Sequence, residues 1–197
     1  GRLAETFPCR LEDTPCYMNF PGNGKKVVYA EDVYVGYRWY DSRRMPVLFP
    51  FGYGLSYTQF DMQNLQVSSR QYNGTDTLEA TVEVTNTGKR TGKHVVQLYV
   101  APPQNAKQPR PVHELKGFEK VELAPGETKT VQFVLDARSF AYYEERIGDW
   151  HIESGEYTLQ AGSSSRALPL TATVEVQSKS LPFVWEDSTT IGDLMEA

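Results

Sequence analysis

The sequence lacks most of the features from which the function of a protein can be recognised directly. No apolar run reaches the roughly 20 residues that a membrane-spanning helix needs, so we predict no membrane partner. Lys and Arg total 20 against 25 Asp and Glu, which gives a net charge of −5. A nucleic-acid surface needs a basic stripe, so this balance argues against a nucleic-acid partner. The first residues show no charged-then-apolar targeting signal, and we assign the chain to no compartment.

Cysteine and histidine are equally scarce. The two cysteines, Cys9 and Cys16, are too few for a disulfide framework, and a bond across the loop between them stays open beside two free thiols. The three histidines, His94, His113 and His151, are scattered and do not sit at ligand spacing. We therefore predict neither a metal site nor a cofactor.

Sequence motifs for common enzyme classes are missing too. The chain has no nucleophile elbow, phosphate loop, zinc signature or calcium loop. Gly52-Tyr53-Gly54 approaches a dinucleotide-binding fingerprint, but the third glycine and a surrounding βαβ unit are both missing. We interpret this segment as a tight aromatic turn.

Two pairs of adjacent carboxylates, Glu31-Asp32 and Glu144-Glu145, could in number support glycoside hydrolysis. Neighbours in an extended strand point to opposite faces, however, so neither pair can easily flank one bond. We interpret both pairs as surface charge or as local salt bridges to Arg38 or Arg146. The sequence thus predicts no catalytic residue, and it leaves substrate-binding residues unassigned.

Residues 1–60 combine many aromatic side chains with Pro and Gly residues that interrupt every candidate helix. The aromatic residues have no regular spacing, and Val33-Tyr34-Val35 is the best short strand. This composition is typical of an extended strap that packs over a larger body. At the other end, residues 178–197 form an acidic exit segment in which Thr190 begins a truncated helix. Both ends suggest a piece of a longer polypeptide.

Residues 61–177 alternate between apolar and polar side chains with a period of two, which predicts half-buried antiparallel strands. Turn residues separate the runs, and the antibody pattern of paired core cysteines is absent. These features predict a two-sheet β-sandwich of the immunoglobulin or fibronectin type III kind, and they favour the fibronectin type III kind. The alternating runs are residues 78–84, 96–100, 131–135, 157–161 and 172–176.

Two features leave a role with carbohydrate open. Trp39, Trp150 and Trp185 could stack on sugar rings, although a Trp among strand-like aromatics is more often core or interface. Asn73-Gly74-Thr75 is an N-glycosylation sequon, and its Asn-Gly step also marks a turn.

Two longer motifs point to a family. The segments YAEDVYVGYRWYD (residues 29–41) and FPFGYGLSYTQF (residues 49–60), at this spacing, closely resemble the C-terminal part of glycoside hydrolase family 3, the β-glucosidase family. GRLAETFP (residues 1–8) is similar to the last strand of that family's α/β sandwich domain. Residues 10–20 look like the linking strap of many bacterial and some yeast members.

The following region resembles the family's fibronectin type III-like domain. The resemblance therefore covers nearly the whole chain and implies a mainly β fold. It implies a fibronectin type III-like (immunoglobulin-like) β-sandwich, preceded by an extended aromatic-rich strap from the end of an α/β domain. The implied divisions are 1–60 for the terminal strand and strap, 61–177 for the sandwich and 178–197 for the exit segment. The matching motifs are VTNTG (84–88), VVQLYV (95–100), LKGF (115–118), LAPGE (123–127) and GEY (155–157).

The resemblance also implies a parent enzyme, a retaining exo-acting β-glycosidase. In this family an Asp nucleophile sits in a (β/α)8 barrel and a Glu acid/base sits in the α/β sandwich domain. Neither motif occurs here, so no catalytic residue carries over. The implied role is to support and orient the remaining catalytic domains, which are the expected partners together with the β-glucoside bound by the full enzyme. The barrel domain can precede or follow this segment. A free-standing carbohydrate- or protein-binding module and a purely structural spacer are the alternatives.

Overall fold

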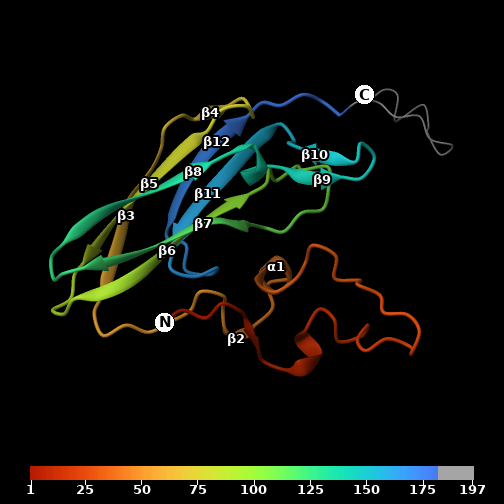
Figure 1. Ribbon diagram of the computed structural model, residues 1–197, viewed down its shortest axis with the longest axis horizontal. Coiled ribbons are helices and arrows are strands. Elements are labelled where there is room, and N and C mark those ends of the chain that lie inside the picture. Colours follow the sequence, from red (N-terminus) through yellow and green to blue (C-terminus); the bar gives the residue numbers. More distant parts are fainter. Residues whose placement is uncertain (182–197) are drawn as a thin grey trace.

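The computed structural model describes residues 1–181 and is mainly β. Two sheets stack into a sandwich, as the alternating sequence predicts (Figure 1). One sheet has five strands in the order β4-β12-β11-β6-β7, and the other has three in the order β3-β5-β8. Their bounds are β3 Phe60–Val67, β4 Gln71–Tyr72, β5 Leu78–Asn86, β6 Gly92–Ala101, β7 Glu114–Leu123, β8 Thr128–Leu135, β11 Gly155–Gly162 and β12 Leu170–Val176.

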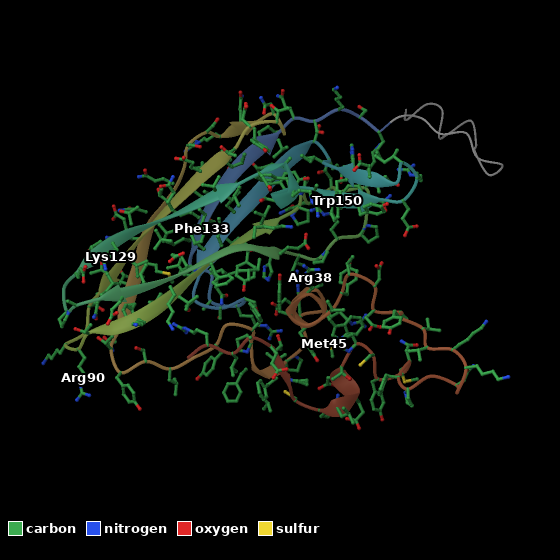
Figure 2. All side chains as sticks on the ribbon, viewed as in Figure 1. Arg38, Met45, Arg90, Lys129, Phe133 and Trp150 are labelled. Atoms are coloured by element: carbon green, nitrogen blue, oxygen red, sulfur yellow. The ribbon has the colours of Figure 1, made fainter. Side chains whose placement is uncertain are left out.

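The apolar residues of each alternating run face the space between the sheets. In β5, Leu78, Ala80, Val82 and Val84 are all buried, while the residues between them point outward. Phe133 of β8 lies between the sheets as well (Figure 2). Burial of this apolar area supplies the main driving force for folding.

Strand β6 departs from this pattern because both of its faces are buried. Val96 and Leu98 belong to the core between the sheets. Gln97 and Tyr99 point to the other face and yet are only 4% and 0% exposed. The first 60 residues run beneath this sheet as a strap and cover its outer face (Figure 1). The strap is therefore part of the folded unit, and it packs against the outer face of β6.

Little of the strap is regular. Strand β1 (Phe7–Pro8) pairs antiparallel with β2 (Val47–Phe49) in a small sheet of its own. Between them lie the 3₁₀ turn η1 (Leu11–Asp13) and one short helix, α1 (Tyr37–Ser42). Outside the strap, the 3₁₀ turn η2 (Ala137–Ser139) leads to a hairpin of β9 (Tyr142–Glu144) and β10 (Asp149–His151). No helix in residues 1–181 has the length and apolarity to cross a membrane.

Two expectations for the strap are wrong. Val33-Tyr34-Val35 is not a strand, because no neighbouring strand pairs with it. Helix α1 begins directly afterwards, although the Pro and Gly residues of this region predict that every helix is interrupted. It forms because residues 37–42 contain neither, and because Gly36 takes a φ of 56° at the turn into the helix. The truncated helix predicted at Thr190 lies outside the described residues.

The burial of Leu98 gives a test of the sandwich core. Leu98→Ala removes apolar volume from a fully buried site, so it should lower the free energy of unfolding by about 3 kcal/mol. Urea denaturation of the full chain measures this. Val134→Ala, at a side chain that is 61% exposed, is the matched control and should change the midpoint little. Equal losses in the two variants would contradict the assignment of the core.

Candidate functional site

The two members of each carboxylate pair differ in burial, and in the pair Glu31-Asp32 the first is half-buried and the second exposed. Glu144 is buried and accepts a hydrogen bond of 2.8 Å from Arg146 Nε, whereas Glu145 is exposed. The bonds from Arg146 are the main reason why the pKa of Glu144 lies below its ordinary value. This is the local salt bridge predicted from the sequence. In residues 1–181 no group of three or more His, Cys, Asp or Glu is placed to hold a metal ion.

The most elaborate polar arrangement is the contact between the strap and the sandwich. At its centre is Asp41 of helix α1, whose side chain is 6% exposed. Arg166, from the turn after β11, donates from Nε to Asp41 Oδ1 at 2.6 Å. Arg166 Nη2 also donates to the Tyr40 and Met45 carbonyls, at 3.3 and 2.8 Å. One guanidinium thus holds a helix side chain and two strap carbonyls together.

A histidine completes the surroundings of this carboxylate. His113 Nε2 lies 3.4 Å from Asp41 Oδ2, and its Nδ1 lies 3.1 Å from Gln160 Oε1. Burial alone raises the pKa of Asp41, but the contacts with His113 and Arg166 outweigh it, so the pKa is below its ordinary value. Asp41 therefore stays ionised at neutral pH, as the contact with Arg166 requires.

Helix α1 makes two further connections to β7. The Leu115 N–H donates to the Tyr37 hydroxyl at 2.7 Å, and the Tyr37 ring packs edge-on against Tyr99 with centroids 5.7 Å apart. Arg38 Nη2 lies 3.2 Å from a Glu114 carboxylate oxygen. Arg38 thus has the fixed carboxylate partner expected of a planar guanidinium, although that partner is not Glu31. The helix is fixed by aromatic packing as well as by charge.

The first residues of the strap are attached separately. Arg2 donates to the Gly54 carbonyl at 3.1 Å, and its Nη2 lies 3.0 Å from His94 Nδ1 on β6. Gly54 has no room for a side chain, because a Cβ there would collide with the Gly1 carbonyl. Burial and the nearby Arg2 charge lower the pKa of His94 to about 4. His94 is therefore neutral, so its Nδ1 can accept from Arg2.

The strap also carries large apolar side chains that nothing in residues 1–181 covers. The most exposed of them are Met18, Tyr29, Leu55 and Tyr57, at 87%, 80%, 83% and 95%, followed by Leu11 and Phe20 at 71% and 70%. The strap is thus bound on one side and bare on the other.

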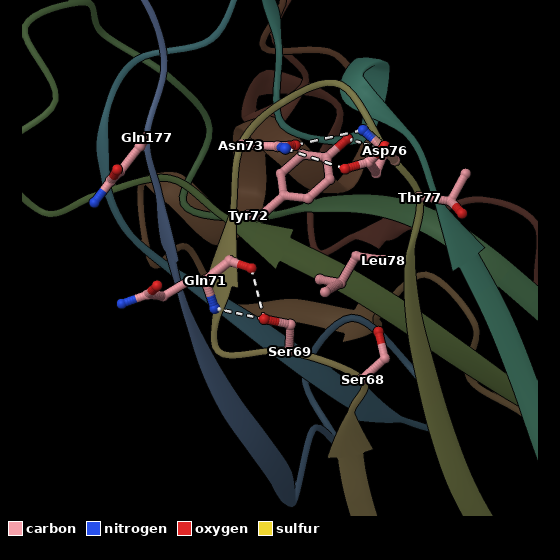
Figure 3. A pocket seen from close by; sticks show the side chains of 9 residues that line it. All are labelled: Ser68, Ser69, Gln71, Tyr72, Asn73, Asp76, Thr77, Leu78 and Gln177. Atoms are coloured by element: carbon pink, nitrogen blue, oxygen red, sulfur yellow. Dashed lines mark hydrogen bonds between the residues drawn. The ribbon is translucent and has the colours of Figure 1, made fainter.

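An open polar hollow of about 420 Å³ lies at the end of the sandwich beside β4 (Figure 3). Asn73 is exposed at its rim, where its Oδ1 accepts from the Thr75 N–H and hydroxyl at 3.0 and 2.9 Å. Its Nδ2 donates to Asp76 Oδ2 at 3.0 Å. The Asn-Gly step is therefore a hydrogen-bonded turn, while a glycan on Asn73 stays a prediction.

The remaining candidates fall in different places. Trp39 is half-buried and donates from Nε1 to the Asp13 carbonyl at 3.1 Å, so it is a packing residue. Trp150 is 42% exposed on the β9–β10 hairpin, and Trp185 lies outside the described residues. Cys9 and Cys16 are both free thiols.

Comparison with known proteins shows which proteins this chain is similar to. Residues 94–165 match the family model described as a fibronectin type III-like domain. The chain is 49% identical to the thermostable beta-glucosidase B of Acetivibrio thermocellus, over 90% of this chain and 23% of that protein. It is 46% identical to a beta-glucosidase of Kluyveromyces marxianus, over 84% of this chain and 19% of that protein. It is also 46% identical to an exo-alpha-(1->6)-L-arabinopyranosidase of Bifidobacterium breve, over 90% of this chain and 23% of that protein.

Solved structures that resemble this chain are also beta-glucosidases. The GH3 beta-glucosidase of Bifidobacterium adolescentis superimposes with a TM-score of 0.88 at 43% identity, covering 98% of this chain and 28% of that one. The beta-glucosidase 3B of Thermotoga neapolitana, solved with glucose, superimposes with a TM-score of 0.80 at 41% identity. That match covers 89% of this chain and 24% of the other. The chain thus spans about a quarter of the length of the proteins that it matches.

Neutralising Asp41 should loosen the strap. Asp41→Asn keeps the shape but removes the charge that Arg166 faces, so it should cost about 2 kcal/mol of unfolding free energy. Urea denaturation gives this value, and limited proteolysis should show faster cleavage near residues 37–46. Asp61→Asn, at an exposed position of β3, is the control. Unchanged stability and proteolysis in Asp41→Asn would contradict the role given to this carboxylate.

His94 should make the stability depend on pH. Its pKa is lowered from 6.5 to about 4 on folding, so the unfolded chain binds the proton more readily. Neutral His94 therefore makes its full contribution to the free energy of unfolding above pH 6.5. The free energy of unfolding falls by about 3 kcal/mol as the pH drops to 4. His94→Gln, which cannot take up a proton, should flatten urea midpoints measured between pH 6.5 and 5. His151→Gln, at a half-buried histidine, should keep most of the slope. A wild-type slope in His94→Gln would contradict this prediction.

Proposed function

The chain matches the C-terminal region of glycoside hydrolase family 3 β-glucosidases, and on this premise we propose that it is the non-catalytic supporting part of a retaining β-glucosidase. The full enzyme would hydrolyse terminal β-glucosyl residues. Its two catalytic carboxyl groups would stand about 5 Å apart across the glycosidic bond. We assign neither of them to this chain, because Glu144 is held in a local salt bridge with Arg146 and the sequence contains neither catalytic motif of the family.

The proposal divides the chain into three parts. Residues 1–60 would complete the preceding catalytic portion, residues 61–177 would form the fibronectin type III-like domain, and residues 178–197 would lead out of it. The fibronectin type III-like match at 94–165 falls within the second part. The remaining catalytic domains would then be the main partner of this chain.

The main support for this proposal is that the strap is packed against the sandwich on one side and exposed on the other. Asp41, Arg38 and Tyr37 fix one side of it to the sandwich. Its other side bears side chains such as Leu55 and Tyr57 that are more than 80% exposed. A catalytic portion packed on the bare side would be joined rigidly to the sandwich through the strap. Rigid joining matters because small displacements of catalytic groups reduce rates strongly.

The sugar preference would be decided elsewhere. Proteins named as beta-glucosidases and as an arabinopyranosidase match this chain at nearly the same identity, 49%, 46% and 46%. This region therefore does not separate the two specificities. We propose a β-glucoside as the substrate because beta-glucosidases recur among the matches in both sequence and structure.

Reconstitution tests the proposal. The purified 197-residue chain should not hydrolyse an aryl β-glucoside alone, and it should restore hydrolysis when mixed with the separately produced catalytic portion. Turnover by the chain alone would show that a catalytic pair lies within it. No activity in either arm, with both parts folded, would contradict the supporting role.

The bare side of the strap can be tested in the same assay. Leu55→Ser combined with Tyr57→Ser removes exposed apolar area, so the restored activity should fall about tenfold at limiting concentration. The urea midpoint of the chain alone should not change, because neither side chain is buried. Val134→Ser, on the opposite sheet, is the control and should leave the restored activity unaltered. Full activity in the double variant would show that these residues do not face the catalytic portion.

A further inference from the structure

The β9–β10 hairpin displays an aromatic pair. Tyr143 and Trp150 are direct partners in its register, so their side chains share one face. They remain 51% and 42% exposed. Their ring centroids are 5.5 Å apart at an interplanar angle of 70°. Two aromatic side chains are thus held at a fixed mutual angle and remain open to solvent.

A guanidinium completes the group. Arg138, from η2, lies over the Trp150 ring with Cζ 3.3 Å from the ring centroid. Among residues 1–181 it forms no hydrogen bond or ion pair, so this cation–π contact alone fixes it. Its N–H donors are therefore free for a ligand. The Trp150 Nε1–H and the Tyr143 hydroxyl likewise bond to no other described residue.

We propose that Trp150, Tyr143 and Arg138 form a binding platform for β-linked gluco-oligosaccharides. A β-glucopyranose ring carries its hydroxyl groups equatorially, so its two faces present only C–H groups and are flat and apolar. Such a face matches an exposed aromatic ring, and the hydroxyl rim matches planar donors such as Arg138. The choice of a β-glucan over other sugars rests on the proposed function.

The surroundings favour a sugar over a protein partner. The hairpin is short, and charged residues that are all exposed, Glu145, Arg146 and Asp149, flank the aromatic pair. A stable protein interface needs about 20 residues a side, with an apolar centre. One or two sugar units need only an aromatic ring and a few hydrogen-bonding groups. Trp39 offers a contrast, since its indole N–H is already bonded within the strap.

The position suits a role beside the catalytic portion. The hairpin, with Trp150 on it, lies at the same end of the molecule as the tip of the strap (Figures 1 and 2). Among the exposed apolar side chains of the strap are Phe20 and Tyr29, at 70% and 80%. An oligosaccharide held on the hairpin would thus be close to the surface where the catalytic portion is proposed to pack.

Calorimetric titration of the full 197-residue chain with cellotetraose tests the platform. We expect saturable binding, weakened at least about tenfold in Trp150→Ala and largely kept in Trp150→Phe, which retains a ring. Tyr57→Ala, which removes an exposed aromatic residue of the strap, should bind like the wild type. Maltotetraose, whose α-linkages do not give a flat chain, should bind at least about tenfold more weakly.

Three results would overturn the proposal: no saturable binding of cellotetraose, equal binding of maltotetraose, or undiminished binding by a folded Trp150→Ala. If Trp150→Ala fails to fold, Tyr143→Ser provides the same comparison at the neighbouring ring. The titration uses no catalytic portion, so it is independent of reconstitution. Restored hydrolysis without sugar binding would overturn only the platform, and sugar binding without restored hydrolysis would overturn only the supporting role.

Discussion

A buried carboxylate must be paired, and this requirement at Asp41 organises how the strap joins the sandwich. An unpaired charge in such a place would cost several kcal/mol, so the side chain is stable there only with Arg166 and His113 against it. Arg166 in turn binds the Tyr40 and Met45 carbonyls. Helix α1, its exit and the turn after β11 are thereby fixed at one point.

The second consequence concerns β6. With the strap in place, Gln97 and Tyr99 are enclosed on the outer face of the sheet, and the Tyr99 hydroxyl donates to Gln97 Oε1 at 2.6 Å. Polar groups enclosed in this way are stable only when they bond to one another. The strap and the sandwich therefore depend on each other, and only the opposite side of the strap is left bare. The proposed supporting role in a larger glycosidase would explain why one side of the strap is packed against the sandwich and the other is exposed.

Much of the sandwich could be predicted from the sequence, because period-two alternation reports one buried face directly. Leu78 to Val84 of β5 show this clearly. The same rule failed where burial has another origin, as at Gln97 and Tyr99, whose cover comes from a distant segment. Helix α1 was missed because six residues carry too little periodicity. The contact between Asp41 and Arg166 spans 125 residues, and no local pattern connects them. The exposed Trp150 was predicted as a candidate, but its pairing with Arg138 depends on the path of η2.

A double-mutant cycle on Asp41 and Arg166 tests the central claim most directly. The free energies of unfolding would be measured in urea for Asp41→Asn, Arg166→Met, the double variant and the wild type. If this pair joins the strap to the sandwich, the coupling energy should be about 1–3 kcal/mol. Additive effects, with a coupling near zero, would show that the strap is held without this pair and would contradict the account.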